Sequence, residues 1–162
     1  MIRACCIGWP IQHVRSPLIH GFWLKTYGID GDYTREAVEP GGAADFLRSL
    51  ADRGFAGCNV TIPHKEAAFA AMDEVEPGAV AVGAVNTVWH DAGRLIGMNS
   101  DVTGFLRNLD EQVPGWDGEV GHAVVLGAGG AARGIVHGLL SRGVEVVTLA
   151  NRSREKAEAI AA

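Results

Sequence analysis

His122-Ala-Val-Val-Leu126, followed by Gly127-Ala-Gly-Gly-Ala-Ala132, carries the clearest indication of the fold. An apolar strand that leads into a glycine-rich turn and then into a helix matches the G-x-G-x-x-A fingerprint of dinucleotide-binding domains. In that pattern Gly127 allows the tight turn, Gly129 lets the backbone approach a pyrophosphate, and Ala132 permits close packing of the helix. Glycine-rich turns also join many strands and helices that bind no ligand, but the strand before this turn and the helix after it favour nucleotide binding.

The residues predicted to hold this nucleotide lie in the glycine-rich turn and just after the next strand. That strand, residues 144–150, ends at Asn151-Arg-Ser-Arg-Glu-Lys156, where an NAD site would place an acidic residue and where arginine instead suits a 2′-phosphate. NADP is therefore the preferred cofactor, with Arg152 as the leading candidate for its phosphate. The alternative is an ordinary basic helix start, which the positive end of the helix dipole disfavours. The candidate cofactor residues are Gly127, Ala128, Gly129, Gly130, Ala131, Asn151, Arg152, Ser153, Arg154 and Lys156.

Asn59-Val-Thr-Ile-Pro-His-Lys65 groups an amide, a hydroxyl and an amine at an expected junction of strand and helix. Pro63 can open the following helix, expected over residues 66–72, so that Lys65 projects from its first turn. A cation is unexpected there because the N-terminal end of a helix is positive, and an acid/base role would explain it. The alternative is a solvated surface lysine and an ordinary strand residue Thr61, and this segment alone does not decide between the two.

Three further segments group hydroxyl, amide and carboxylate side chains beside glycine or proline. They are Ser16-Pro17-Leu-Ile-His20, Gly83-Ala-Val-Asn-Thr87 and Gly97-Met-Asn-Ser-Asp101. Structural roles remain open, since Asn86 could cap a turn and Asp101 could cap a helix over residues 102–109. Together with residues 59–65, these segments resemble the substrate domain of the shikimate dehydrogenase family, and the resemblance covers residues 2–162.

The resemblance implies a reaction and a set of substrate contacts. The reaction is the reversible, NADP-dependent reduction of 3-dehydroshikimate to shikimate, in the biosynthesis of chorismate and the aromatic amino acids. Lys65 and Asp101 would form the catalytic pair, because oxidation of an alcohol releases a hydroxyl proton that a nearby amine or carboxylate must accept. The implied substrate-binding residues are Ser16 for the carboxylate, Asn59, Thr61, Asn86 and Asp101 for the ring hydroxyls, and Lys65 beside the reacting carbon.

Val14 departs from the family pattern, which usually has a second serine two residues before the serine that precedes proline. Loss of a hydrogen bond to a charged group costs about 1.5 to 3 kcal/mol, so weaker shikimate binding is expected unless Arg15 or another donor compensates. Two milder departures are Val102 after Asp101 and Ser100 in place of threonine. Val14 keeps a quinate or related hydroxy-acid dehydrogenase open as an alternative, and a non-catalytic shikimate-binding fragment is another.

The composition is that of an ordinary soluble globular protein, with 48% hydrophobic and 20% charged residues among 162. A net charge of −5 gives no general attraction to nucleic acid or to anionic membranes, so neither is a predicted partner. The sequence shows no long apolar span and no signal peptide. Cys5, Cys6 and Cys58 lack metal-ligand spacing and lie in apolar runs, which indicates buried thiols, no metal site and a reducing cytoplasm. His64 is interpreted as a neighbour of Lys65 and not as a catalytic residue.

Alternating strands and helices predict an open α/β substrate domain over residues 1–105 and a Rossmann-like NADP-binding domain over residues 119–162. The other expected elements are strands at 2–7 and 33–38, helices at 17–27 and 41–53, and a turn at 114–118. A mononucleotide-binding half needs a βαβαβ unit, and the sequence supplies only two of its strands, so an incomplete Rossmann-like domain is expected. Its uncovered apolar surface predicts pairing with another chain, for example in a homodimer.

Overall fold

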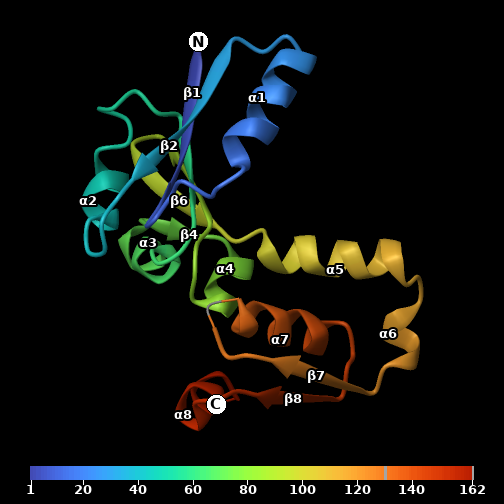
Figure 1. Cartoon of the computed structure of the whole chain (residues 1–162). Coiled ribbons are helices and arrows are strands. Elements are labelled where there is room, and N and C mark those ends of the chain that lie inside the picture. The colour runs from blue at the N-terminus through green and yellow to red at the C-terminus, as the bar shows by residue number, and fades with distance from the viewer. Residues whose placement is uncertain (130, 162) are drawn as a thin grey trace. The chain divides into compact units, whose positions relative to one another are not determined.

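The computed structural model describes residues 1–129 and 131–161 of the chain. The chain forms two compact units, Met1–Asn99 and Ser100–Ala162, which run from blue to yellow and from yellow to red in Figure 1. Each unit has its own sheet and its own core. Residues 100–105, which the sequence assigns to the substrate domain, lie in the second unit. The functional limits of the two domains stay predictions. Within the described residues, no helix combines the length and the apolar character needed to cross a bilayer.

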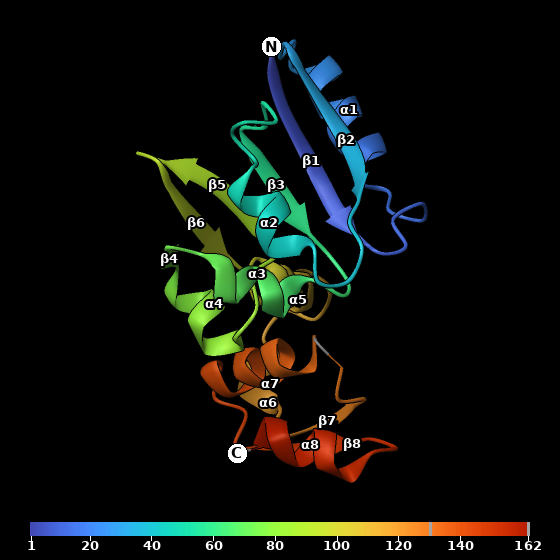
Figure 2. The same ribbon diagram turned by 90° about the vertical axis from the view of Figure 1, so that its left-hand side faces the viewer.

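The first unit is built on a six-stranded sheet with the strand order β2-β1-β3-β5-β6-β4. Its strands are β1 (Ile2–Gly8), β2 (Gly31–Ala37), β3 (Gly57–Val60), β4 (Glu74–Val75), β5 (Thr87–Asp91) and β6 (Arg94–Met98). β1 lies parallel between β2 and β3, whereas β5 runs antiparallel to both β3 and β6. The predicted open α/β sheet is confirmed, and the carboxyl ends of β1 and β3 meet at the same edge (Figure 2).

Helices cover both faces of this sheet. They are α1 (Ser16–Thr26), α2 (Ala43–Arg48), α3 (Lys65–Ala71) and α4 (Pro77–Val82). Because alternate side chains of a strand point to opposite faces, the central strand β1 contributes to two cores. Cys5 and Ile7 enter the main core together with Leu47 of α2, whereas Cys6 enters a smaller core beside Leu24 of α1. Burial on both sides explains why β1 reads as an almost continuous apolar run.

The second unit pairs two parallel strands, β7 (His122–Leu126) and β8 (Val146–Ala150). Its helices are α5 (Asp101–Gln112), α6 (Trp116–Glu119), α7 (Ala132–Ser141) and α8 (Arg154–Ala161). The core of this unit centres on Trp116, Leu139 and Val144. Val124 and Leu126 are 59% and 84% exposed, because they lie on the face of β7 opposite to that core. Two parallel strands joined by a helix agree with the expected Rossmann-like arrangement.

Helices α5 and α7 approach each other closely at Gly138, which has no side chain to separate them. A Cβ atom at Gly138 would lie 3.1 Å from Val102 Cγ1 and 3.5 Å from the side chain of Leu106. Contacts this close leave little room for even one added methyl group. Val102, which departs from the family pattern in the sequence, therefore fills the space that Gly138 leaves at this contact.

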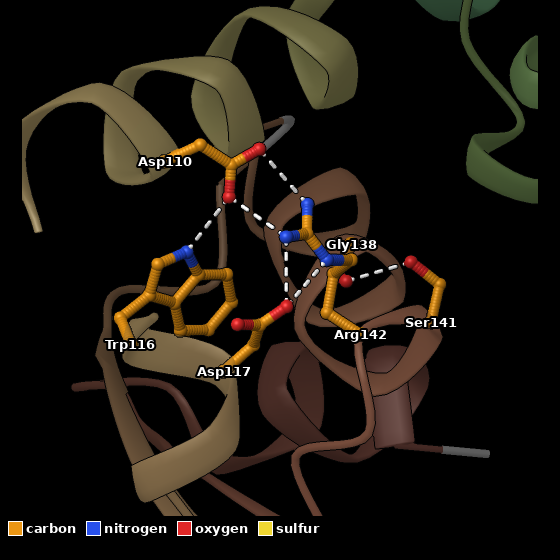
Figure 3. Close-up of polar contacts among 6 residues, drawn as sticks. All are labelled: Asp110, Trp116, Asp117, Gly138, Ser141 and Arg142. Carbon is orange, nitrogen blue, oxygen red and sulfur yellow. Dashed lines mark hydrogen bonds and ion pairs between the residues drawn. The ribbon is translucent and has the colours of Figure 1, made fainter. Parts of the chain in front are cut away.

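Arg142, at the end of α7, joins α5, α6 and α7 through charged hydrogen bonds (Figure 3). Its guanidinium donates to both carboxylate oxygens of Asp110, at 2.8 and 3.0 Å, and to Asp117 at 2.9 Å. The Trp116 indole Nε1 donates to Asp110 at 3.1 Å. Hydrogen bonds from Arg142 and then from Trp116 hold the pKa of Asp110 below its ordinary value. The two carboxylates in turn raise the pKa of Arg142 above its ordinary value.

The helix predicted over residues 41–53 is wrong in its second half. The helix α2 ends at Arg48, and the chain then turns back toward β3. The Ser49 hydroxyl donates to the Phe46 carbonyl at 2.9 Å and thus competes with helical bonding of the backbone. The turn is completed at Gly54, whose φ of +77° is a conformation that glycine adopts readily.

One alternative left open by the sequence and one shorter prediction also need correction. Asp101 does not cap the following helix, because Ser100 takes the N-cap position and Asp101 is the first residue of α5. The turn predicted over residues 114–118 contains the start of the short helix α6, which begins at Trp116. Gly115, with a φ of +82°, turns the chain just before α6, and burial of Trp116 in the core holds the helix in place.

Candidate functional site

The segments that carry Asn59, Lys65 and Asn86 are joined by backbone hydrogen bonds beyond the end of β3. The Val60 N–H donates to the Asn86 carbonyl at 2.8 Å, and the Val85 N–H donates to the Lys65 carbonyl at 3.0 Å. These bonds connect two stretches of sequence that are far apart along the chain. The first unit thus brings three of the predicted substrate-binding residues into one neighbourhood.

Thr61 is held in place by the end of β1. Its N–H donates to the Ile7 carbonyl at 3.0 Å, and its own carbonyl accepts from the His64 N–H at 2.9 Å. Gly8 faces Thr61 so closely that a Cβ atom there would lie 2.6 Å from Thr61 Cγ2 and 2.9 Å from Ile11 Cδ1. Any larger residue at position 8 would force Thr61 or Ile11 to shift, and the sequence alone contained no signal for that close approach.

Lys65 is the first residue of α3, which confirms that it projects from the start of a helix. The neighbouring His64 is 2% exposed, and its Nε2 lies 2.8 Å from the Val38 carbonyl. A carbonyl can only accept, so Nε2 carries the proton and donates. The interpretation of His64 as a neighbour of Lys65 agrees with this buried contact, which anchors the start of α3.

Two residues that sequence inspection missed, Tyr33 and Thr87, contact the predicted amides Asn59 and Asn86. The Tyr33 hydroxyl donates to Asn59 Oδ1 at 2.6 Å. Asn59 Nδ2 donates to Thr87 Oγ1 at 3.0 Å, and the Thr87 hydroxyl donates to Asn86 Oδ1 at 3.0 Å. Thr87 stands next to Asn86 in a segment already singled out, whereas no signal marked Tyr33. Tyr33, Asn59 and Thr87 also line a cavity of about 380 Å³.

Ser16 opens α1 and is connected to this group through His20 and Tyr33. The Ser16 carbonyl accepts from His20 Nδ1 at 2.9 Å, and the His20 ring stacks on the Tyr33 ring with centroids 4.0 Å apart. Burial is the largest influence that raises the pKa of Tyr33, and a hydrogen bond with the Ser16 side chain offsets part of that rise. Ser16, predicted to bind the carboxylate, and Asn59, predicted to bind a ring hydroxyl, therefore belong to one packed cluster around Tyr33.

Val14, the departure from the family pattern, packs its side chain against the smaller core of the first unit. Its carbonyl accepts a hydrogen bond from Arg35 Nε at 2.8 Å. The Arg35 guanidinium therefore lies beside the backbone of the residue that departs from the family pattern. Compensation for the missing serine by Arg15 or another donor stays a prediction, and Arg35 is one such donor beside Val14.

The three cysteines are buried, as predicted, with exposed fractions of 0 to 3%. Burial, followed by the neighbouring Cys5, raises the pKa of Cys6 to about 11, and the positive charges of Lys65 and Arg35 offset part of the rise. A hydrogen bond with Cys5, followed by burial, also raises the pKa of Cys58. Cys6 and Cys58 are therefore neutral thiols that serve the core.

The glycine-rich turn of the second unit follows β7 directly. Gly127 has a φ of +106°, which confirms the tight turn, and its N–H donates to the Ala150 carbonyl at 2.8 Å. Ala132 is 6% exposed, which confirms its close packing. Among the described residues other than chain neighbours, no atom lies within 4 Å of the place that a Cβ on Gly129 would take. The backbone at Gly129 is thus open to a ligand.

Asn151 links this turn to the segment after β8. Its side-chain Oδ1 accepts from the Ala128 N–H at 3.2 Å, and its Nδ2 donates to the Ser153 carbonyl at 2.7 Å. The side chain therefore bridges two of the predicted cofactor segments. Gly130, another predicted cofactor residue, lies outside the described residues.

The basic residues after β8 are at the surface. Arg152 and Lys156 are exposed, whereas Arg154 makes a hydrogen-bonded ion pair with Glu158 at 2.7 Å one turn further along α8. Asp101, the second predicted catalytic residue, is exposed as the first residue of α5. Of the three basic side chains, Arg152 comes first after the strand, where a ribose phosphate would be expected.

Comparison with known families agrees with this geometry. The model of the shikimate dehydrogenase substrate binding domain matches residues 6–88, and that of shikimate/quinate 5-dehydrogenase matches residues 111–162. The chain belongs to the shikimate dehydrogenase family. It is 56% identical over 160 residues to the shikimate dehydrogenase (NADP(+)) of Brucella canis, with 99% of the chain covered. The match takes in 55% of the Brucella protein, so the chain spans about half the length of this curated relative.

Solved structures of the shikimate dehydrogenase family have the same fold. The Thermus thermophilus shikimate 5-dehydrogenase, in complex with NADP(H) and shikimate, is 38% identical with a TM-score of 0.85. The Corynebacterium glutamicum quinate dehydrogenase, in complex with NAD, is 32% identical with a TM-score of 0.88. Each match covers 99% of the chain, and 60% and 58% of those two proteins respectively.

Proposed function

We propose that the protein is an NADP-dependent shikimate dehydrogenase, which interconverts 3-dehydroshikimate and shikimate in the biosynthesis of chorismate and the aromatic amino acids. The observation that carries this proposal is the joined pair of segments 59–65 and 84–87 in the first unit. They gather one amine, two amides and two hydroxyls: Lys65, Asn59, Asn86, Thr61 and Thr87. A polyol acid needs such a set of donors and acceptors at fixed angles. The names of the relatives support the same substrate and cofactor.

The chemistry requires a group that moves one proton. Oxidation of shikimate removes a hydride from a ring carbon and a proton from the hydroxyl oxygen on that carbon. NADP, when bound, supplies the acceptor for the hydride. The proton needs a base at the hydroxyl in this direction and an acid at the carbonyl oxygen in the other. We assign this transfer to Lys65 and Asp101, which the family resemblance indicates as the catalytic pair.

The residues of the second unit fit an NADP molecule. The open backbone at Gly129 and the start of α7 suit a pyrophosphate, because the N-terminal end of a helix attracts an anion. Asn151 holds the turn through the Ala128 N–H, so the pyrophosphate is expected at the other amides of the turn. Arg152 is exposed and suits the 2′-phosphate.

The proposal is tested by steady-state kinetics on the protein expressed from its complete natural reading frame. NADPH formation is followed with shikimate and NADP, for wild type, Lys65→Ala and the matched control Lys25→Ala. Loss of a general acid/base is expected to lower kcat by about 100-fold or more in Lys65→Ala, with a smaller change in the KM for shikimate. Lys25, near the end of α1, should be replaceable without effect. Equal turnover in all three proteins would remove Lys65 from the mechanism.

Val14 keeps quinate or a related hydroxy acid as a second candidate substrate, because it lacks the serine hydroxyl expected for the carboxylate and the nearby Arg35 guanidinium is a different kind of donor. A change of donor there alters how the carboxylate is oriented. A non-catalytic shikimate-binding role is the alternative outside the enzyme class, and binding without turnover would identify it. Pairing with a second copy, absence of nucleic-acid partners and a cytoplasmic location stay predictions.

A further inference from the structure

Four polar side chains of the first unit form one continuous hydrogen-bonded chain. It runs from the Tyr33 hydroxyl on β2 to Asn59 on β3, then to Thr87 at the start of β5, and ends at Asn86. The three links measure 2.6, 3.0 and 3.0 Å. Two members, Asn59 and Asn86, are proposed to contact substrate, whereas Tyr33 and Thr87 reach the site through their hydrogen bonds to these two amides.

The orientation of the Asn59 amide follows from a backbone carbonyl. Asn59 Nδ2 lies 3.3 Å from the Asn86 carbonyl oxygen, which can only accept a hydrogen bond. The reversed amide would place two acceptors against each other, so the nitrogen must lie on this side. Asn59 Oδ1 then faces Tyr33, and the two Nδ2 hydrogens are directed to Asn86 and to Thr87. The oxygen is therefore the end of Asn59 that can serve a further partner.

The orientation of the Asn86 amide follows in turn from Thr87. The Thr87 hydroxyl has one proton, and its oxygen already accepts from Asn59 Nδ2. It donates this proton to Asn86 Oδ1 at 3.0 Å, so in this network the amide oxygen of Asn86 faces Thr87 and its Nδ2 is the donor end of the side chain. The chain thus gives the two neighbouring asparagines opposite characters toward a ligand.

Tyr33 is suited to begin this chain. Its ring is stacked on His20 at an interplanar angle of 9°, which fixes the direction of the hydroxyl. Burial raises the pKa of Tyr33, so the phenol keeps its proton and remains a donor in neutral and moderately alkaline solution. A donor at this position holds Asn59 Oδ1 in place at all those pH values.

We propose that Tyr33 and Thr87 are positioning residues that set Asn59 as an acceptor and Asn86 as a donor toward two hydroxyls of a polyol-acid substrate. The inference rests on the proposed function and adds to it the direction of each hydrogen bond. A hydroxyl that meets Asn59 must donate, and a hydroxyl that meets Asn86 must accept. The chain therefore selects for ring hydroxyls and against analogues in which one of them is missing.

The test compares hydroxyl deletion with hydroxyl retention at the same position. Thr87→Val removes the hydroxyl at nearly constant shape, Thr87→Ser keeps it, and Tyr33→Phe removes only the phenolic oxygen. Matched controls are Thr34→Val and Tyr27→Phe: the Thr34 hydroxyl donates to Glu36, outside the hydrogen-bonded chain of Tyr33, and Tyr27 is 72% exposed. Calorimetry measures the Kd for shikimate and for analogues that each lack one ring hydroxyl, and steady-state kinetics measure kcat and the KM for NADP.

Loss of a hydrogen bond that orients a binding group is expected to weaken shikimate binding about tenfold in Thr87→Val and about three- to tenfold in Tyr33→Phe. Thr87→Ser and both controls should bind like wild type, and the KM for NADP should not change. Thr87→Val should also discriminate less between shikimate and the deoxy analogue that lacks the Asn86 partner. In an Asn59→Ala background, Tyr33→Phe should have no further effect.

Shikimate affinity unchanged in both Thr87→Val and Tyr33→Phe would overturn the inference, and so would weaker binding with unaltered discrimination among the analogues. If circular dichroism shows that Thr87→Val is unfolded, the shikimate affinity of Tyr33→Phe tests the inference instead. That variant deletes a single oxygen and keeps the stacked ring. Failure of the proposed function is distinguishable, because wild type itself would then not oxidise shikimate, whether or not it binds it.

Discussion

The loops that follow β3 and β7 both lead from a parallel strand into a helix, yet they are built in opposite ways. The loop after β3 is bonded to its surroundings at Val60, Thr61 and His64, and Gly8 lies against it. The loop after β7 is tied down at Gly127 and Ala128 but open at Gly129. Groups that bind a substrate must meet several hydroxyls at fixed angles, so the loop that carries them is preorganised by hydrogen bonds. A pyrophosphate is bound by backbone N–H groups, which must stay exposed.

Gly8→Ala is expected to have the largest effect, because the added methyl group would clash with Thr61 in the loop after β3. The new Cβ would meet Thr61 Cγ2 at 2.6 Å and Ile11 Cδ1 at 2.9 Å, and overpacking of this kind costs about 1 to 3 kcal/mol. Thermal or urea unfolding should show this loss of stability, and calorimetry should show weaker shikimate binding. The control is Gly21→Ala on α1, where a Cβ would meet no atom within 4 Å among the described residues. Equal stability and affinity in the two variants would mean that the loop is not held by β1.

Arg152→Ala tests the cofactor side, next to the glycine-rich loop after β7, without disturbing the loop after β3. Loss of a charged hydrogen bond to the 2′-phosphate is expected to weaken NADP binding about tenfold or more while leaving NAD binding almost unchanged. Arg154→Ala is the matched control, because Arg154 is already paired with Glu158. Fluorescence titration with each cofactor measures the ratio of the Kd for NAD to the Kd for NADP. An unchanged preference between NADP and NAD in Arg152→Ala would contradict its assignment to the phosphate.

Arg142→Met should have the smallest effect, confined to the stability of the second unit. Asp110 and Asp117 are partly exposed and would regain solvent, so the melting temperature should fall only slightly. The pKa of Asp110 is lowered in the folded chain from an ordinary value of 3.8, so its contribution is present above that pH and is lost as the pH falls through the folded pKa. The gap in melting temperature between wild type and Arg142→Met should therefore shrink on acidification below that range.

A gap that does not change on acidification would contradict the pairing of Arg142 with Asp110. Shikimate affinity provides the second control, since no atom of the loop after β3 takes part in the hydrogen bonds of Arg142 with Asp110 and Asp117. It should be the same in wild type and in Arg142→Met at neutral pH.

The sequence predicted most of this fold because the decisive signals are local. The apolar run of β7 and the glycines after it mark a strand, a tight turn and a helix without reference to distant residues. Lys65 at the start of α3 and the buried Cys6 followed from similar local patterns. The helix predicted through residue 53 was wrong in its second half, where the Ser49 hydroxyl bonds the Phe46 carbonyl and the chain turns at Gly54.

Sequence inspection failed where a role depends on pairing between strands. Tyr33 looks like an ordinary strand residue, and only the register that places β2 and β3 on either side of β1 brings its hydroxyl to Asn59. The importance of Gly8 likewise comes from a residue far along the chain, because Thr61 follows the neighbouring strand β3. Arg35 reaches Val14 by the same long-range route. Such contacts form only when the strands pair in the folded sheet, so no short stretch of sequence predicts them.

The most direct measurement of the central claim is the comparison of kcat/KM for shikimate and quinate, with NADP, in the protein expressed from its complete reading frame. A prebuilt set of donors and acceptors for the ring hydroxyls of shikimate predicts NADPH formation that is clearly faster with shikimate than with quinate. Formation with quinate at an equal or higher kcat/KM would contradict the assigned substrate. Absence of NADPH formation with either acid, in a folded protein that binds NADP, would contradict the assigned reaction.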